Sequence, residues 1–169
     1  MGSWLELSTA SAKETRAVGA AVAGLLSPGD VVSLTGDLGA GKTTFVQGAA
    51  AALGVTQPVL SPSFTLVREY EGARPISHLD VYRLDRLQDV LDLGFEEMLD
   101  RGATVFIEWG DAIEDLLRDS FLEVELRLPN GGGDEQTDDD ARRLAIEGHG
   151  PTWDPRRERL EAATRQWTA

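Results

Sequence analysis

Residues 36–43 read Gly-Asp-Leu-Gly-Ala-Gly-Lys-Thr, a glycine followed by four residues and then Gly-Lys-Thr. In a loop of this pattern, backbone N–H groups converge on phosphate oxygens, and the glycines allow the backbone to approach them closely. We expect Lys42 to reach the β- and γ-phosphates of a nucleoside triphosphate and the Thr43 hydroxyl to bind Mg²⁺. The pattern therefore predicts a nucleotide-binding loop made of Asp37, Leu38, Gly39, Ala40, Gly41, Lys42, Thr43 and Thr44.

Two carboxylates, Asp80 and Glu108, each end an apolar run of the sequence. A phosphate-binding loop needs an acidic residue at the end of a neighbouring strand, which holds Mg²⁺ directly or through water. Because the run before Glu108 is the more apolar, we expect its strand to be the more central one and assign Glu108 to the metal. Asp80 is then expected to orient or deprotonate the attacking water, or to hold the metal through water. The alternative for each is a surface carboxylate at a strand end.

Three neighbouring features have both a chemical and a structural interpretation. Arg83 would neutralise charge in a transition state or form a salt bridge on the surface. Trp109 follows Glu108 directly and also fits a core or surface aromatic. Residues 61–65 lie where phosphate-loop proteins often carry a segment that senses the γ-phosphate. They equally fit a rigid turn that leads into a strand.

The elements that must position these residues follow from the hydrophobic pattern. Strands alternate with helices, which predicts a three-layer α/β fold with a mostly parallel sheet. The strand at 31–35 leads into the phosphate loop, and a helix follows it. The last two strands would form an antiparallel portion at one edge. We expect strands at 4–7, 31–35, 65–70, 75–79, 103–107, 122–128 and 144–146, and helices at 12–26 (after a capping box at Ser11), 42–53, 84–100 (broken at Gly94), 111–119 and 154–167.

Length and composition limit the function further. The chain of 169 residues suits a single domain, residues 1–169, with a flexible acidic loop at 129–140 and a terminal helix at 154–169. Its net charge of −13 disfavours a direct grip on nucleic acid unless positive charges cluster. The absence of cysteine excludes thiolate zinc sites and cysteine nucleophiles. No apolar run approaches the roughly 20 residues that span a bilayer, so we expect a cytoplasmic protein that does not enter membranes.

Three other classes of phosphate-loop protein are alternatives to an ATPase. A GTPase needs an Asn/Thr-Lys-x-Asp motif, and neither Lys13 nor Lys42 lies in one, which favours ATP. A small-molecule kinase is the stronger rival to an ATPase, but such kinases usually carry an arginine-rich lid, and no basic lid is obvious here. A nucleotide-sensing interaction module without turnover is the third class.

Four motifs, in this order and at these separations, resemble the TsaE family of bacterial ATPases: GDLGAGKTTF at 36–45, SPSFT at 61–65, HLDVYR at 78–83 and IEW at 107–109. The first motif is shared by many ATPases, but the four together are specific. The resemblance covers roughly residues 5–128. Ser63 departs from the threonine that is usual there, and the change keeps a hydroxyl.

The resemblance implies a Mg²⁺-dependent ATPase that is weak alone and is stimulated by its partners TsaB and TsaD. In the family the ATPase works with these partners to produce N6-threonylcarbamoyladenosine in tRNA; it does not make the modification itself but resets or sustains turnover, and it meets the tRNA only through the assembly. The resemblance also supports roles for Lys42 and Thr43 at the phosphates and Mg²⁺, Glu108 at Mg²⁺, Asp80 and Trp109 in function, Thr65 near the γ-phosphate or a partner, and Thr9 near the adenine.

Overall fold

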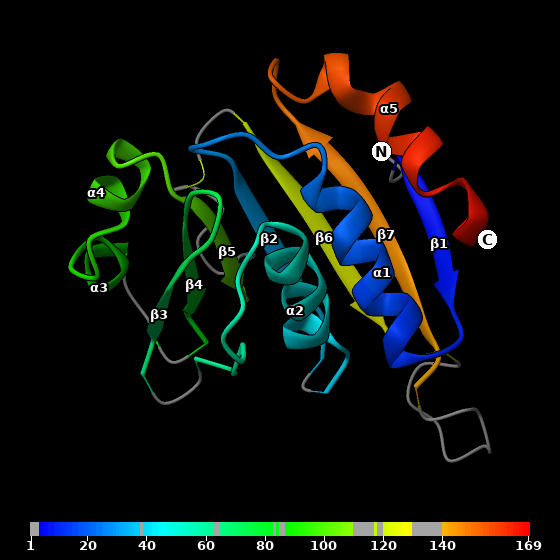
Figure 1. Cartoon of the computed structure of the whole chain (residues 1–169), viewed down its shortest axis with the longest axis horizontal. Coiled ribbons are helices and arrows are strands. Elements are labelled where there is room, and N and C mark those ends of the chain that lie inside the picture. The colour runs from blue at the N-terminus through cyan, green and yellow to red at the C-terminus, as the bar shows by residue number, and fades with distance from the viewer. Residues whose placement is uncertain are drawn as a thin grey trace.

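A seven-stranded sheet forms the centre of the molecule, with the strand order β1-β7-β6-β2-β5-β4-β3 (Figure 1). The computed structural model describes residues 4–37, 39–62, 65–82, 84, 87–109, 117, 120–129 and 140–169. The strands are β1 (Leu5–Thr9), β2 (Val31–Thr35), β3 (Val67–Glu71), β4 (Pro75–Asp80), β5 (Thr104–Glu108), β6 (Phe121–Arg127) and β7 (Arg142–His149). The α-helices are α1 (Ala12–Ala23), α2 (Lys42–Ala52), α3 (Leu87–Leu91), α4 (Phe95–Asp100) and α5 (Arg157–Ala163).

The centre of the sheet is parallel and both of its edges are antiparallel. Strands β6, β2, β5 and β4 are parallel neighbours. On one side β7 pairs antiparallel with both β6 and β1, and on the other side β3 pairs antiparallel with β4. The α/β fold class is therefore confirmed. The sequence predicted only one antiparallel edge, and β6, which was assigned to it, also pairs in parallel with β2. As expected, β5 is more central than β4, since it lies between β2 and β4.

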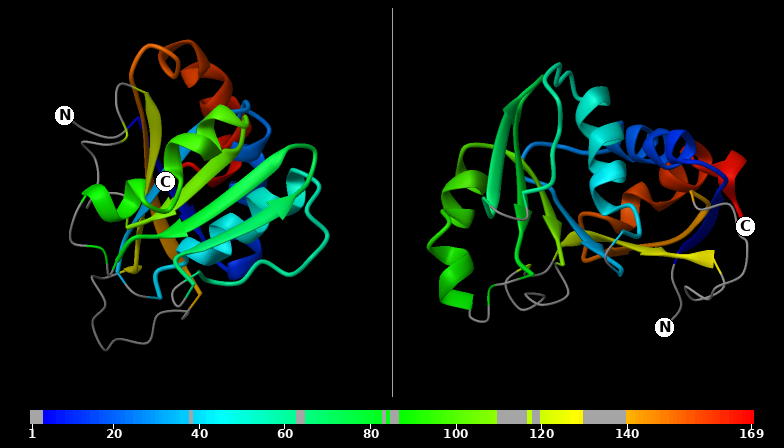
Figure 2. Two further views of the ribbon diagram at one scale, coloured as in Figure 1. Left: turned by 90° about the vertical axis from the view of Figure 1, so that its left-hand side faces the viewer. Right: turned by 90° about the horizontal axis from the view of Figure 1, so that it is seen from below.

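Helices cover the two faces of the sheet unequally (Figures 1 and 2). On one face α1 and α2 lie side by side, and α5 packs next to α1. Helices α1 and α2 pack closely at Gly48 of α2, where a Cβ atom would come within 1.9 Å of the carbonyl oxygen of Arg16 on α1. On the other face, α3 and α4 contribute Val90, Phe95 and Met98 to a second core cluster with β4 and β5. These are the three layers that the sequence predicted.

The predicted element boundaries hold to within a few residues where they fall on described residues. The Ser11 hydroxyl accepts a hydrogen bond from the Glu14 N–H (3.1 Å) at the start of α1. The Glu14 carboxylate pairs with the N–H of Ala10 (3.3 Å) and not with that of Ser11, so half of the capping box forms. Gly94, with φ of 86°, separates α3 from α4 as expected. The predicted helix at 111–119 and acidic loop at 129–140 lie outside the described residues, except for Leu117, Pro129 and Asp140.

The terminal helix predicted at 154–167 is shorter than expected. It consists of α5 flanked by two 3₁₀ turns, Asp154–Arg156 and Arg165–Trp167. It buries Leu160 and Thr164, and the preceding Trp153 lies in the core, so it covers part of the sheet face next to α1. Within the described part of the chain, no helix has the length and apolar character that crossing a membrane requires.

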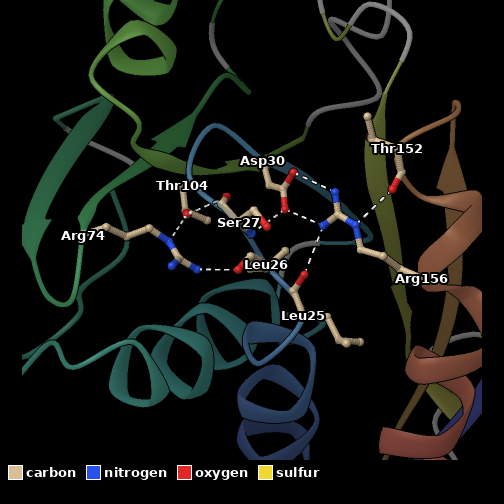
Figure 3. Close-up of polar contacts among 8 residues, drawn as sticks. All are labelled: Leu25, Leu26, Ser27, Asp30, Arg74, Thr104, Thr152 and Arg156. Atoms are coloured by element: carbon tan, nitrogen blue, oxygen red, sulfur yellow. Dashed lines mark hydrogen bonds and ion pairs between the residues drawn. The ribbon is translucent and has the colours of Figure 1, made fainter.

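Two arginines fix the turn between α1 and β2, at the end of β2 opposite to the phosphate loop (Figure 3). Arg156 pairs with both carboxylate oxygens of Asp30, at 2.6 and 3.1 Å, and donates to the carbonyl of Leu25. Arg74 donates to the Thr104 hydroxyl (2.8 Å) and to the carbonyl of Leu26 (2.7 Å). The turn is thus tied both to β5 and to the C-terminal segment.

Replacing Arg156 with alanine is expected to destabilise the fold. The Arg156 and Asp30 side chains are only 12% and 13% exposed, so the substitution leaves a mostly buried carboxylate without its charged partner. We expect the free energy of unfolding, measured in urea, to fall by about 2 kcal/mol or more. The matched control is Arg101→Ala, because Arg101 forms an exposed pair with Glu69 that should contribute about 0.5 kcal/mol or less. Equal losses in the two variants would contradict the anchoring role.

Candidate functional site

The phosphate loop connects β2 to α2, as the sequence predicted. Gly36, Gly39 and Gly41 have φ angles of 135°, 81° and 107°, a region that residues with a side chain rarely adopt. At Gly36 a Cβ atom would also come within 2.3 Å of the Leu126 carbonyl oxygen. The backbone conformation therefore favours glycine at all three positions, and at Gly36 the contact with β6 requires it as well. Leu38 lies outside the described residues.

Lys42 is buried inside this loop. Its ammonium donates to the carbonyl oxygens of Gly36 (2.7 Å) and Asp37 (3.0 Å). It also lies 4.0 Å from the centroid of the Trp109 ring, a distance at which the ring face attracts a cation. The structure thus places Trp109 over the loop lysine.

The backbone of Trp109 has an unusual conformation, with φ of 68°. This region costs a non-glycine residue about 1–3 kcal/mol. Its N–H donates to the Leu34 carbonyl oxygen at 2.7 Å, which fixes the residue at the end of β2. The Tyr82 ring lies 4.7 Å from the Trp109 ring and is 64% exposed. The strained turn therefore directs the indole towards both Lys42 and an exposed aromatic.

Asp80 and Glu108 are direct neighbours across β4 and β5. They are 6% and 4% exposed, so neither is the surface carboxylate of the alternative interpretation. Glu108 Oε2 accepts a hydrogen bond from the Thr43 hydroxyl (3.0 Å) and lies 2.5 Å from His78 Nε2. Asp80 Oδ1 accepts from the N–H of Tyr82 (2.9 Å). Two carboxylates are thereby held next to the start of α2.

One cavity of about 220 Å³ joins these groups, and its lining residues are Gly39, Gly41, Lys42, Thr43, Thr44, Ser61, Asp80, Glu108 and Trp109. Carboxylate and hydroxyl oxygens are the ligands that Mg²⁺ prefers, so Glu108 and Thr43 fit a magnesium ion in this cavity. Asp37 and Ala40, also predicted to bind nucleotide, do not line it. Ala40 is buried, and its N–H donates to the Asp37 carbonyl oxygen (3.0 Å).

A second, smaller cavity of about 60 Å³ lies along the same loop. Its walls include Gly39, Gly41 and Thr44, which it shares with the first cavity, together with Ala12, Thr15, Asp140 and Arg142. Thr9 was predicted near the adenine. The Thr9 hydroxyl is buried and lies 2.7 Å from the hydroxyl of Thr15. Thr9 therefore contacts a residue that lines the cavity but does not line the cavity itself.

The described residues of the segment at 61–65 are hydrogen-bonded just before β3. The N–H groups of Thr65 and Leu66 both donate to the Pro62 carbonyl oxygen, at 3.1 and 2.7 Å. The Leu66 carbonyl in turn accepts from the N–H of Asp80 (3.0 Å). Thr65 is exposed and does not line the main cavity, whereas Ser61 does. Residues 63 and 64 of this segment and Arg83 lie outside the described residues.

Arg142, which the sequence analysis missed, holds the phosphate loop from the side. From the start of β7, its guanidinium donates to the carbonyl oxygens of Ala40 (3.0 Å) and Gly39 (3.1 Å). It is separated from the loop by more than one hundred residues, and nothing in the local sequence distinguishes it from the other arginines. His78 was missed as a site residue too, although its spacing of two residues from Asp80 places both on one face of β4.

We expect Arg142→Met to weaken ATP binding about tenfold. Loss of a charged donor to the loop carbonyls destabilises the loop conformation by roughly 1.5 kcal/mol. That free energy corresponds to a tenfold change in affinity. Titration with a fluorescent ATP analogue measures the affinity. Arg159→Met is the matched control, because Arg159 is an exposed arginine of α5 and lines neither of the cavities described above. An affinity that is the same in both variants would disprove the role of Arg142.

A group of charged residues on β6 and β7, separate from Arg142, lies on the sheet face opposite to α1: Glu123, Glu125, Arg127, Glu147 and His149. The hydrogen bond from Arg127 lowers the pKa of the Glu125 carboxyl, and the same contact raises the pKa of Arg127. His149 lies 2.8 Å from Glu123 and 3.9 Å from Glu147, and all three are partly exposed. Glu125, Arg127 and Arg143 line a further cavity, of about 330 Å³, together with Gly36 and Asp37 of the phosphate loop.

Comparison with known proteins identifies the family. Residues 9–136 match the family model described as "Threonylcarbamoyl adenosine biosynthesis protein TsaE". The chain is 40% identical over 133 residues to the tRNA threonylcarbamoyladenosine biosynthesis protein TsaE of Bacillus subtilis, covering 78% of this chain and 82% of that protein. The protein of the same name from Treponema pallidum is 40% identical over 127 residues, covering 75% of this chain and 94% of that one.

The likeness extends to the three-dimensional structure. The crystal structure of Bacillus subtilis YdiB superposes with a TM-score of 0.72 and 33% sequence identity, covering 96% of this chain and 95% of that one. The family model ends at residue 136, but this coverage brings β7 and α5 into the shared fold. By its sequence and its fold, the chain belongs to the TsaE family.

Proposed function

We propose that this protein is a Mg²⁺-dependent ATP-binding and ATP-hydrolysing subunit of N6-threonylcarbamoyladenosine biosynthesis in tRNA. One observation carries the ATPase part: the buried carboxylates of Asp80 and Glu108 share a cavity with Lys42 and Thr43 of the phosphate loop. The names of the relatives support the pathway.

Each group has a chemical task in this proposal. Lys42 binds the β- and γ-phosphates, together with the N–H groups at the start of α2. Thr43 and Glu108 hold Mg²⁺, which neutralises charge on the phosphates when bound. Asp80 orients a water molecule or accepts its proton. The water oxygen bonds to the γ-phosphorus, the bond from that phosphorus to the bridging oxygen breaks, and ADP and phosphate leave.

The charge of the chain supports a division of labour with partner proteins. At a net charge of −13, the protein as a whole repels the phosphate backbone of tRNA. We therefore propose that TsaB and TsaD contact the tRNA, and that this protein supplies ATP turnover to their assembly in the cytoplasm.

Phosphate release with and without the cognate TsaB and TsaD proteins tests the proposal. We expect weak hydrolysis by the protein alone and a marked rise in the assembly. The absence of a rise would refute the coupling to TsaB and TsaD. Transfer of a labelled γ-phosphate to a metabolite would indicate a small-molecule kinase instead. Partner binding that requires ATP, is unchanged with a nonhydrolysable analogue and proceeds without turnover would indicate a nucleotide-sensing module.

A further inference from the structure

His78 lies beneath the candidate site, on β4 between the core and Glu108. Its side chain is 0% exposed, and its Nε2 lies 2.5 Å from Glu108 Oε2. Within the described part of the chain, Nδ1 has no hydrogen-bond partner. Among the described residues, Glu108 is therefore the hydrogen-bond partner of the His78 imidazole.

The direction of this hydrogen bond follows from the chemistry of its partner. An ionised carboxylate only accepts hydrogen bonds, so His78 donates through Nε2–H. The Thr43 hydroxyl donates to the same oxygen from α2. Two donors from different elements restrict the rotation of the Glu108 carboxyl group.

Packing alone does not explain a histidine at this position. A buried polar nitrogen without a partner costs about 1–3 kcal/mol, and an aliphatic side chain of similar size would avoid that cost. The feature that an aliphatic side chain lacks is the N–H donor to Glu108.

We propose that His78 is a positioning residue that holds the Glu108 carboxylate in the orientation in which it meets Mg²⁺ and ATP. The inference rests on the proposed function, because it assigns His78 to the reaction through Glu108. Outer partners of this kind typically change metal affinity or activity by about 10- to 100-fold when they are removed.

Two substitutions separate the donor from the volume of the side chain. His78→Leu removes the N–H, whereas His78→Gln keeps an N–H at about the reach of Nε2. Ser77→Ala is the matched control: Ser77 is the preceding residue of β4, is equally buried, has no partner for its hydroxyl among the described residues, and faces away from Glu108.

The measurements are ATP affinity in Mg²⁺ and in EDTA, kcat and KM for hydrolysis with TsaB and TsaD, and the melting temperature. We expect His78→Leu to lower kcat and the affinity gained from Mg²⁺ about 10- to 100-fold, with affinity in EDTA changed by less than about twofold. His78→Gln should recover most of both losses, and Ser77→Ala should match the wild type. In a Glu108→Ala background, His78→Leu should cause no further loss, because residues that act through one group are not additive.

The outcomes distinguish this inference from the proposed function. Equal losses in the Leu and Gln variants, or a full additional loss on top of Glu108→Ala, would overturn the positioning role while leaving the ATPase assignment intact. A wild-type protein whose ATP affinity is unaffected by Mg²⁺ and that shows no hydrolysis would overturn the proposed function itself. If His78→Leu does not fold, His78→Asn replaces it, since asparagine is too short to reach Glu108, and the comparison with His78→Gln decides in the same way.

Discussion

Lys42→Ala is expected to abolish measurable ATP binding. Among the described residues that line the main cavity, Lys42 is the cation, and its ammonium is already held within the loop by the Gly36 and Asp37 carbonyl oxygens. Hydrogen bonds from an ammonium to phosphate oxygens contribute about 1.5–3 kcal/mol each. Loss of two such bonds raises the Kd by at least about 100-fold, which titration with a fluorescent ATP analogue measures directly.

The control for this substitution is Lys13→Ala. Lys13 is the other lysine of the chain; it is exposed on α1 and lines none of the three cavities described above. Lys13→Ala should leave the Kd for ATP unchanged. A loss of affinity confined to Lys42→Ala is then due to the phosphate loop and not to the change in net charge. A normal Kd in Lys42→Ala would contradict phosphate binding by this loop.

Substitution of either buried carboxylate should separate binding from hydrolysis. Asp80→Asn and Glu108→Gln keep the size of the side chains but remove the negative charge. We expect each to lower kcat about 100-fold or more, the range for loss of a positioned acid–base group, while ATP is still bound. Phosphate release in the assembly with TsaB and TsaD measures kcat, and Glu69→Gln on the exposed part of β3 is the control.

The two carboxylate variants should also differ from each other. If Glu108 holds the metal, Glu108→Gln loses the gain in ATP affinity that Mg²⁺ provides, whereas Asp80→Asn keeps it. The opposite result would exchange the two roles. Normal hydrolysis in both variants would refute the assignment of the site.

Local sequence patterns predicted the parts of the site that depend on neighbouring residues. The phosphate loop needs glycines at fixed positions, and the strand ends that carry Asp80 and Glu108 follow from apolar runs, so the sequence located all three. Direct pairing of the two carboxylates across β4 and β5 agrees with the expectation that parallel strands end at one edge.

Contacts between distant segments were not predictable in this way. Arg142 reaches the loop from β7, and a donor that serves backbone carbonyls has no sequence signature. The antiparallel pairing of β3 with β4 was missed for a different reason: the two strands are close in sequence, and their short connection favours a hairpin, a signal that the sequence analysis did not use. The hydrogen bond from His78 to Glu108 depends on the register of two strands, which hydrophobic patterns do not determine.

The anchored turn before β2 has a mechanical consequence for the site. All five residues of β2 are buried, and the strand is hydrogen-bonded along its length to β5 and β6. The two arginines of Figure 3 anchor the turn that precedes β2. We therefore expect β2 to be a rigid part of the fold. If the loop binds ATP as proposed, we therefore expect the backbone to move from Gly36 onwards and not in β2.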